Sequence, residues 1–254
     1  MAFRKGFMPE GTTNINPPVP PIIDRISIDF DSRYNVSDYM GSVMAWQDVT
    51  GEFNLSMSGG GSGNINSQTI NGIRCVTLTS SQATLGSADV SRLNLKQDNI
   101  TVVFVANIAT ITAQSDLGVQ TYNNGQANPQ ILGVAVNPNQ LSRVRVRPGI
   151  GATIDTGSAS AINMNGVPKI SMLSAGTSQN LKMRVNKTSL TVNKEPDITF
   201  GNTIDRLDII KTMGNSGANG FTAIARVLVF DWALNAEEMD ELFDELSETY
   251  GITL

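Results

Sequence analysis

The stretch ARVLVFDWALNAEEMDELFDELSETYGI, residues 225–252, joins an apolar strand to a single amphipathic helix. Residues 225–230 are rich in β-branched and aromatic side chains, which is typical of a strand buried on both faces. Asn235 and Glu238 have the spacing of a helix N-cap and its capping box. Gly251 then supplies the left-handed residue that ends many helices. The sequence therefore predicts one C-terminal helix of about 15 residues.

This helix has one apolar and one acidic face. Its apolar side chains recur every three or four residues, so they lie on the same side. At about 1.5 Å per residue the helix spans ~22 Å, enough to cross one face of a β-sheet. We interpret the acidic side chains as a solvated face rather than a metal or catalytic cluster. The apolar residues are Met239, Leu242, Phe243, Leu246 and Tyr250, and the acidic ones are Glu237, Glu238, Asp240, Glu241, Asp244, Glu245 and Glu248.

The composition excludes several kinds of chemistry. The 254 residues include one cysteine, Cys75, and no histidine, so a disulfide framework and imidazole-based catalysis are both excluded. The net charge of −5 argues against nonspecific nucleic-acid binding, and we expect no nucleic-acid partner. We also expect no cofactor.

Residues 1–22 differ in character from the rest of the chain. Four prolines favour an extended path and forbid a regular helix. The basic start is not followed by an apolar segment, so the sequence predicts no signal peptide, and no stretch is apolar enough to predict membrane insertion. We interpret residues 1–22 as an anchoring arm that binds a larger assembly, in which Arg4 and Lys5 dock on an acidic subunit. The prolines of this arm are Pro17, Pro18, Pro20 and Pro21.

From residue 23 to 254 short strand-like runs alternate with turns rich in Gly, Asn and Ser. Roughly a dozen such runs, about ten residues apart, are typical of one β-sandwich or barrel. NITVVFVANI, residues 99–108, is a continuous apolar run and predicts a central strand. LKMRVNKTSLTVNK, residues 181–194, predicts a hairpin with VNKTSL at its tip.

The order of these segments resembles the concanavalin A-like lectin/glucanase fold in its laminin-G-like branch. The matching segments are DFDSR, GSVMAWQDVTGEFNLSMS, NGIRCVTLTSSQATLG, the central strand, the hairpin and the closing strand with its helix. The resemblance covers residues 24–254. It implies an all-β, two-sheet antiparallel jelly-roll sandwich with one C-terminal α-helix. Such folds host lectins, enzymes and structural modules, so the fold alone assigns no function.

The carboxylates of the first predicted strand are weak candidates for chemistry. Hydrolytic relatives of the fold carry Glu-x-Asp-x-(x)-Glu on one strand, and this sequence has no such pattern. Asp29 and Asp31 come nearest, but we interpret them as anchors of the following loop. We therefore predict that the chain is not an enzyme, with glycoside hydrolysis as the alternative. Asp29, Asp31, Asp38 and Asp48 could supply calcium ligands, but ordinary loop acids explain them better and we assign no metal site.

Aromatic residues are the candidates for glycan contact. Tyr34, Tyr39 and Tyr122 lie in turn-rich stretches, where a ring can meet a ligand. Trp46 and Trp232 could stack on a sugar, but each lies at the end of an apolar strand, which favours packing. Trp232 is kept as a candidate contact.

The segment RVRVR places three arginines at alternate positions of one predicted strand. One interpretation is a basic stripe that meets an acidic partner or an anionic glycan. The alternative is a solvated outer strand face. The three residues are Arg143, Arg145 and Arg147.

The sequence leads to a main functional hypothesis and an alternative. A lectin-like fold without secretion signal or disulfides favours a non-catalytic structural or decoration protein of a tailed bacteriophage, assembled in the host cytoplasm and displayed on the virion surface. Its partners would be capsid or tail proteins and copies of itself. The alternative is a carbohydrate-binding adhesin or receptor-binding module that recognises host-surface glycans.

Overall fold

The computed structural model describes residues 21–39, 42–56, 65–78, 84–110, 115–122, 130–136, 142–148, 154–155, 166–176, 180–190, 203–210 and 220–254. These ranges hold seventeen strands, one α-helix and two short 3-10 helices. The elements are η1 (Ile22–Arg25), β1 (Ile28–Asp31), β2 (Val36–Tyr39), β3 (Ser42–Gln47), β4 (Asn54–Ser56), β5 (Ile65–Ile70), β6 (Ile73–Leu78), β7 (Thr84–Asp89), η3 (Ser91–Leu93), β8 (Ile100–Thr110), β9 (Ser115–Tyr122), β10 (Gln130–Val136), β11 (Ser142–Pro148), β12 (Ile154–Asp155), β13 (Lys169–Gly176), β14 (Asn180–Val185), β15 (Thr188–Leu190), β16 (Arg206–Ile210), β17 (Gly220–Phe230) and α1 (Ala236–Tyr250).

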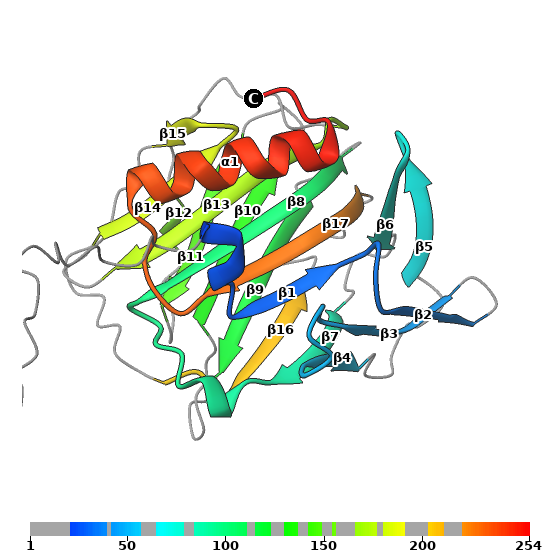
Figure 1. Ribbon diagram of the computed structural model, residues 1–254, viewed down its shortest axis with the longest axis horizontal. Helices are drawn as coiled ribbons and strands as arrows, with labels where there is room; N and C mark the ends of the chain where they lie inside the picture. Colours follow the sequence, from blue (N-terminus) through cyan, green and yellow to red (C-terminus); the bar gives the residue numbers. More distant parts are fainter. Residues whose placement is uncertain are drawn as a thin grey trace, which may run out of the picture.

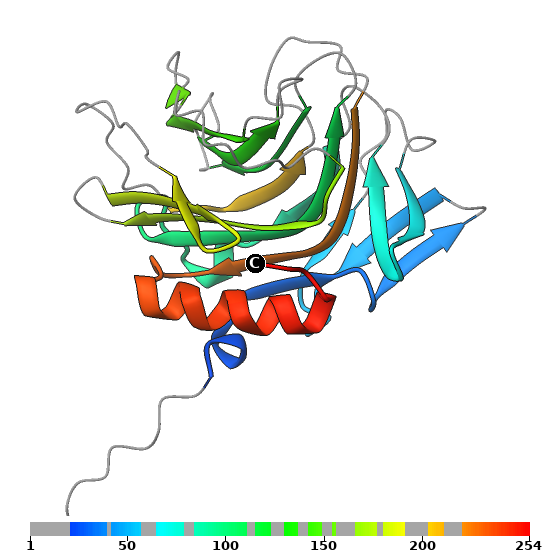
Figure 2. The same ribbon diagram turned by 90° about the horizontal axis from the view of Figure 1, so that it is seen from above.

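The strands form two antiparallel layers that are joined at one corner. The helix-side sheet runs β15-β14-β13-β8-β17, and β1 and the β6–β5 pair continue it beyond β17. The far sheet runs β12-β11-β10-β9-β16-β7-β4-β3-β2. Among the described residues, one pairing between Ser42 and Asn66 joins them. Figures 1 and 2 show α1 lying across the outer face of the helix-side sheet, which confirms the predicted sandwich with one C-terminal helix.

Strand β8 explains why the central run of the sequence is apolar without alternation. Val102 and Phe104 point into the core between the two sheets. Val103 and Val105 point the other way, into a second core beneath α1. Both faces of the strand are therefore buried, so the usual alternation of apolar and polar residues disappears.

Helix α1 begins and ends as its sequence predicts. The Asn235 side chain accepts a hydrogen bond from the Glu238 amide, and the Glu238 carboxylate accepts one from the Asn235 amide. Gly251 has φ of 61°, the left-handed conformation that lets the helix stop. All five predicted apolar residues of the helix are buried in the second core. Within the described ranges no helix is long and apolar enough to cross a membrane.

Strand β17 carries a bulge at Ala225. Its partner positions on β8 step from Ile224↔Ala106 to Arg226↔Val105, so Ala225 has no partner. On one edge of β17, β6 pairs with the residues before the bulge and β1 pairs with the residues after it. Two strands that are distant in sequence therefore lie end to end, and they meet beside the bulge.

The first described residues are fixed to α1. The Ile22 amide donates a hydrogen bond of 3.1 Å to Glu241, and Arg25 forms an ion pair with Glu238. Arg25 also lies over the Trp232 ring, 4.5 Å from its centroid. Ile22 itself is buried in the second core. Anchoring by the arm stays a prediction, because Arg4, Lys5, Pro17, Pro18 and Pro20 lie outside the described residues.

The predicted hairpin tip is confirmed between β14 and β15. Asn186 and Lys187 both have positive φ, 44° and 63°, as a tight two-residue hairpin turn requires. The Asn186 side chain also accepts a hydrogen bond from the Ile170 amide and donates one to the Thr253 carbonyl. This turn therefore ties the C-terminus of the chain to β13.

We predict that Phe243→Ala destabilises the protein by about 3–5 kcal/mol, because it removes a fully buried ring from the second core. The measurement is the free energy of unfolding in urea. Glu248→Ala on the exposed face of the same helix is the control, with a change within about 0.5 kcal/mol. Equal effects of the two substitutions would mean that α1 does not pack as described.

Candidate functional site

The turn that follows β1 presents the most prominent exposed aromatic ring among the described residues. The Asp31 side chain accepts a hydrogen bond of 2.9 Å from the Arg33 amide, and the Asp31 carbonyl accepts one of 3.0 Å from the Tyr34 amide. Asn35 leaves the turn with φ of 53°, a conformation that asparagine adopts more readily than most residues. The backbone from Asp31 to Asn35, here called the Tyr34 turn, is therefore fixed by its own hydrogen bonds.

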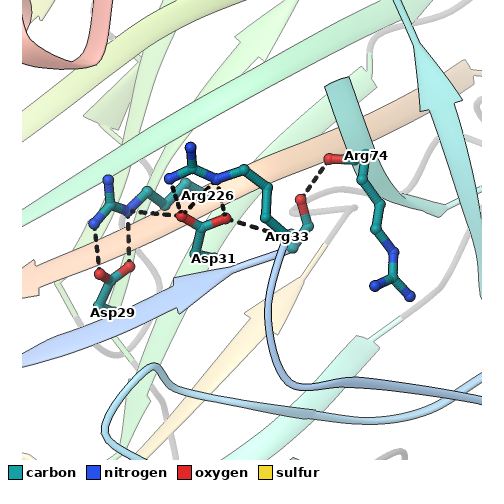
Figure 3. Close-up of polar contacts among 6 residues, drawn as sticks. Asp29, Asp31, Arg33, Arg74 and Arg226 are labelled. Carbon is teal, nitrogen blue, oxygen red and sulfur yellow. Dashed lines mark hydrogen bonds and ion pairs between the residues drawn. The ribbon is translucent and has the colours of Figure 1, made fainter. Parts of the chain in front are cut away.

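A buried charge network supports this turn (Figure 3). Arg226, at the bulge of β17, donates a hydrogen bond of 2.8 Å from Nε to Asp29 and a second from Nη2. Its Nε also lies 3.7 Å from an Asp31 carboxylate oxygen. Asp31 is only 1% exposed and binds the Arg33 guanidinium through both of its oxygens. Two carboxylates and two guanidinium groups therefore balance one another in charge.

The network shifts the titration of its members. Burial raises the pKa of Asp29, and the hydrogen bonds from Arg226 offset part of this rise. Burial alone would lower the pKa of Arg226, but its bonds to Asp29 raise it overall. The hydrogen bond with Asp31 raises the pKa of Arg33 in the same way. Both arginines therefore remain charged over the whole physiological range.

The bulge at Ala225 determines on which face of the sheet Arg226 lies, and it also binds the Tyr34 turn. Ala225 and Leu228 both face the second core, so Arg226 lies on the helix side of the sheet with them. The Ala225 carbonyl accepts a hydrogen bond from the Ser32 amide at 2.8 Å, and the Ser32 hydroxyl donates to the carbonyl of Arg74 on β6. The Tyr34 turn is thereby attached to β17 and β6 at once.

Arg33 lies between two aromatic rings. Its guanidinium carbon is 5.4 Å from the centroid of Tyr34 and 4.9 Å from that of Tyr250. Tyr34 is 54% exposed, whereas Tyr250, the last residue of α1, is 6% exposed. Burial raises the pKa of Tyr250, and the neighbouring Asp31 adds to the effect, so its hydroxyl stays protonated. Of these two rings, that of Tyr34 is the one open to solvent.

Two surface depressions lie at the two ends of α1. The first, of about 230 Å³, adjoins the N-terminal end and the second, of about 250 Å³, adjoins the C-terminal end. The first is lined by Asn99, Ser174, Gly176, Lys182, Ala233, Leu234 and Asn235. The second is lined by Asn71, Ile73, Val167, Pro168, Lys169, Tyr250, Gly251, Ile252 and Thr253. Both combine polar and apolar groups in a volume near the lower limit of small-molecule pockets.

The aromatic residues considered for glycan contact differ in their exposure to solvent. Tyr34 is exposed, as a ligand contact requires. Trp232 is half-buried between Arg25 and the edge of Phe230, so it packs at the rim of the second core. Trp46 is fully buried, which confirms core packing. Tyr39 and Tyr122 end β2 and β9, and their side chains lie outside the described part of the structure.

The structure says less about the residues predicted to bind a partner. Arg143, Arg145 and Arg147 are alternate residues of β11, which pairs with β10, but their side chains are also outside the described part. Pro21 is described and exposed, and its carbonyl accepts a hydrogen bond from the Asp24 amide. Binding of a partner through either group stays a prediction.

The four carboxylates considered for calcium all have other roles. Asp29 and Asp31 belong to the charge network, and Asp38 pairs with Arg74. The Asp48 carboxylate accepts hydrogen bonds from the Thr50 hydroxyl and the Phe53 amide, so it fixes a turn. Only Asp48 is a loop acid as predicted, because Asp29, Asp31 and Asp38 lie in strands β1 and β2. Of the two expected anchors of the loop after β1, Asp31 bonds to that loop, whereas Asp29 pairs with Arg226.

Sequence reasoning missed Arg226 and the two lysines of the depressions. Arg226 interrupts an otherwise apolar strand, and a charge in a strand buried on both faces was the signal that could have revealed a buried partner. Lys169 and Lys182 carry no comparable signal, because Lys169 begins β13 and Lys182 lies within β14, and the surroundings of both depend on the packing of α1.

No protein-family model matches the chain, and none of the curated proteins matches it in sequence. Solved structures do share its fold. A Trypanosoma rangeli sialidase in complex with sialic acid has a TM-score of 0.56 at 16% identity, over 91% of this chain and 34% of the sialidase. The botulinum neurotoxin serotype D ligand binding domain in complex with N-acetylneuraminic acid has a TM-score of 0.57 at 11% identity, over 87% of this chain and 51% of that chain.

The binding domain of Paraclostridial Mosquitocidal Protein 1 has a TM-score of 0.60 at 13% identity, over 89% of this chain and 53% of that domain. This chain therefore spans about a third to a half of the length of these proteins. Such similarities support a jelly-roll-like β-sandwich. None of these three structures bears on a bacteriophage origin.

The prediction that the chain is not an enzyme is wrong as it was drawn. Sialidases are enzymes, and their structures are among those that share this fold. The missing histidine excludes imidazole chemistry alone, because glycoside hydrolysis can use carboxylates or a tyrosine. One missing carboxylate pattern excludes only the enzymes that use it.

We predict that Arg226→Met lowers the free energy of unfolding by about 3–5 kcal/mol, because it leaves the buried Asp29 carboxylate without its cation, while Asp31 keeps its pair with Arg33. Unfolding in urea at pH 7 measures the loss. Arg92→Met is the control: it breaks an exposed pair with Glu52, whose side chains are 54% and 58% exposed, and should cost at most about 1 kcal/mol.

A second change separates unpaired charge from lost packing. Asp29→Asn in the Arg226→Met background should recover part of the stability, since it removes the charge that Arg226→Met leaves uncompensated. If the double variant is no more stable than Arg226→Met alone, the loss is one of packing.

Proposed function

We propose that this chain is a carbohydrate-binding β-sandwich domain, and that the Tyr34 turn is part of its binding face. The observation that carries the proposal is the Tyr34 ring, 54% exposed on a turn that buried hydrogen bonds hold in place. Aromatic rings bind ligands through their faces at little cost in conformational entropy. Arg33 beside it adds hydrogen-bond donors, which sugar hydroxyl groups accept.

Arg33 has donor capacity left for a ligand. Its bonds to Asp31 use Nε and Nη2, and among the described residues Nη1 has no hydrogen-bond partner. The side chain is 36% exposed. A guanidinium that is held by a buried carboxylate loses little freedom when it binds, which favours recognition of a polar ligand.

The similar structures support this choice of ligand class. Two of them are complexes with sialic acid or N-acetylneuraminic acid, and a third is a binding domain. Their low sequence identity limits the similarity to the fold. The sugar is therefore inferred from the exposed ring and its neighbouring donor in this chain.

The role on a virus particle, with display of the domain on the virion surface, has no support from these similarities. It stays a prediction that rests on the lectin-like fold without secretion signal or disulfides and on the Pro-rich residues 1–22, and the expected virion partners and self-association stay predictions with it. A glycan-binding domain on such a particle would combine both hypotheses, because attachment to a host requires a surface ligand.

Tyr34→Ala should weaken glycan binding at least about fivefold, since a ring covered by a ligand contributes on the order of 1 kcal/mol. A glycan array identifies the ligand, and calorimetry with the best glycan measures the change. Met44→Ala, which truncates another exposed apolar side chain (49% exposed), is the control and should bind as the wild type does. An array without hits, or a Tyr34→Ala variant of unchanged affinity, would refute this site.

A further inference from the structure

Lysines and arginines differ in how their charges are compensated. Each arginine with a described side chain forms an ion pair. Two examples are Arg33 with Asp31 and Arg184 with Asp240. Lys187 pairs with Asp244, and Lys96 donates a hydrogen bond to Thr203. Among the lysines and arginines with described side chains, only Lys169 and Lys182 have neither an ion pair nor a side-chain hydrogen bond. Each of them lines one of the two depressions beside α1.

The two depressions differ in the polar groups that they offer a ligand. Beside Lys182, Asn99 accepts a hydrogen bond from the Ala233 amide, the Ser174 hydroxyl bonds to the Leu234 carbonyl, and Asn235 caps α1. Those groups are already used by the fold. Beside Lys169, the side chains of Asn71 and Thr253 have no hydrogen-bond partner among the described residues. The second depression therefore has three uncommitted polar groups.

Its remaining wall is apolar. Ile73, Val167, Pro168 and Ile252 line it, and Val167 is 41% exposed. A sugar ring has hydroxyl groups on its rim and C–H groups on its faces, so a pocket with one polar and one apolar wall suits it. The volume of about 250 Å³ lies just below the roughly 300 Å³ at which pockets for drug-sized ligands begin, a size that suits one sugar unit.

We propose that the depression at the C-terminal end of α1 binds a carboxylate-bearing sugar unit, whose carboxylate pairs with Lys169 while Asn71 and Thr253 bind its hydroxyl groups. This inference rests on the proposed function and names the ligand class. The C-terminal end of α1 carries the negative pole of the helix dipole, so an anion bound beside this end needs a compensating cation. Lys169 is the cation that this depression supplies.

The depression adjoins the Tyr34 turn through Tyr250. Tyr250 lines the depression, and Arg33 lies over its ring and beside Tyr34. The carboxylated unit would therefore occupy one subsite and a neighbouring unit would contact Tyr34. A glycan with at least two sugar units is the ligand that uses both.

The test uses the full ¹⁵N-labelled chain and the methyl glycoside of N-acetylneuraminic acid, with the methyl ester of the same sugar as the uncharged probe. The acid should shift the amide signals of Asn71, Lys169 and Thr253 and bind about tenfold more tightly than the ester, since one charge-assisted hydrogen bond is worth that factor. Lys169→Gln should abolish the difference, because it lowers the affinity for the acid to that for the ester. Lys182→Gln is the matched control and should behave as the wild type.

Two results would overturn the subsite. One is an acid and an ester that bind equally to the wild type, and the other is a Lys169→Gln variant that keeps the tenfold preference. If Tyr34→Ala still weakens glycan binding in either case, the proposed function survives and this subsite does not. If the wild type binds neither probe and no glycan on the array, both fail. Equal urea unfolding of Lys169→Gln and the wild type establishes that the variant is folded.

Discussion

The ion pairs between Arg226 and the two carboxylates of β1 stabilise the junction of β17, β1 and β6, on which the position of the Tyr34 turn depends. They lie at the bulge of β17, where β1 and β6 meet end to end and where the C-terminal end of α1 packs. A charge buried at this depth is costly unless it is fully paired. Here the pairing is bidentate to Asp29, and Asp31 divides its charge between Arg226 and Arg33.

The bulge allows Arg226 to reach Asp29 and Asp31. In a regular strand Arg226 would lie on the face opposite to Ala225, in the mainly apolar core between the sheets. The extra residue keeps Arg226 on the helix side, opposite Asp29 and Asp31. One irregular residue in β17 thus decides where the only buried guanidinium of the described residues can lie.

The sequence predicted the architecture well, because its signals are local. The capping box, Gly251 and the apolar stripe fix α1 almost residue by residue, and the continuous apolar run fixes β8. The site was predictable only in part. Tyr34 was identified from its turn-rich context, but the network beneath it joins residues about 200 positions apart, such as Asp29 and Arg226. Long-range pairing of this kind depends on strand register, which a bulge shifts without any local signal.

Preorganisation connects the buried network to binding. Sugars are strongly hydrated, so a binding site gains little from each contact and loses affinity whenever its own side chains must be ordered. The Tyr34 turn is already ordered before a ligand binds, because Asp31 fixes both the backbone of the turn and the Arg33 guanidinium. A network that is costly to bury is therefore more easily explained by the rigidity it confers on the exposed turn than by stability alone, since an apolar replacement could stabilise the fold as well.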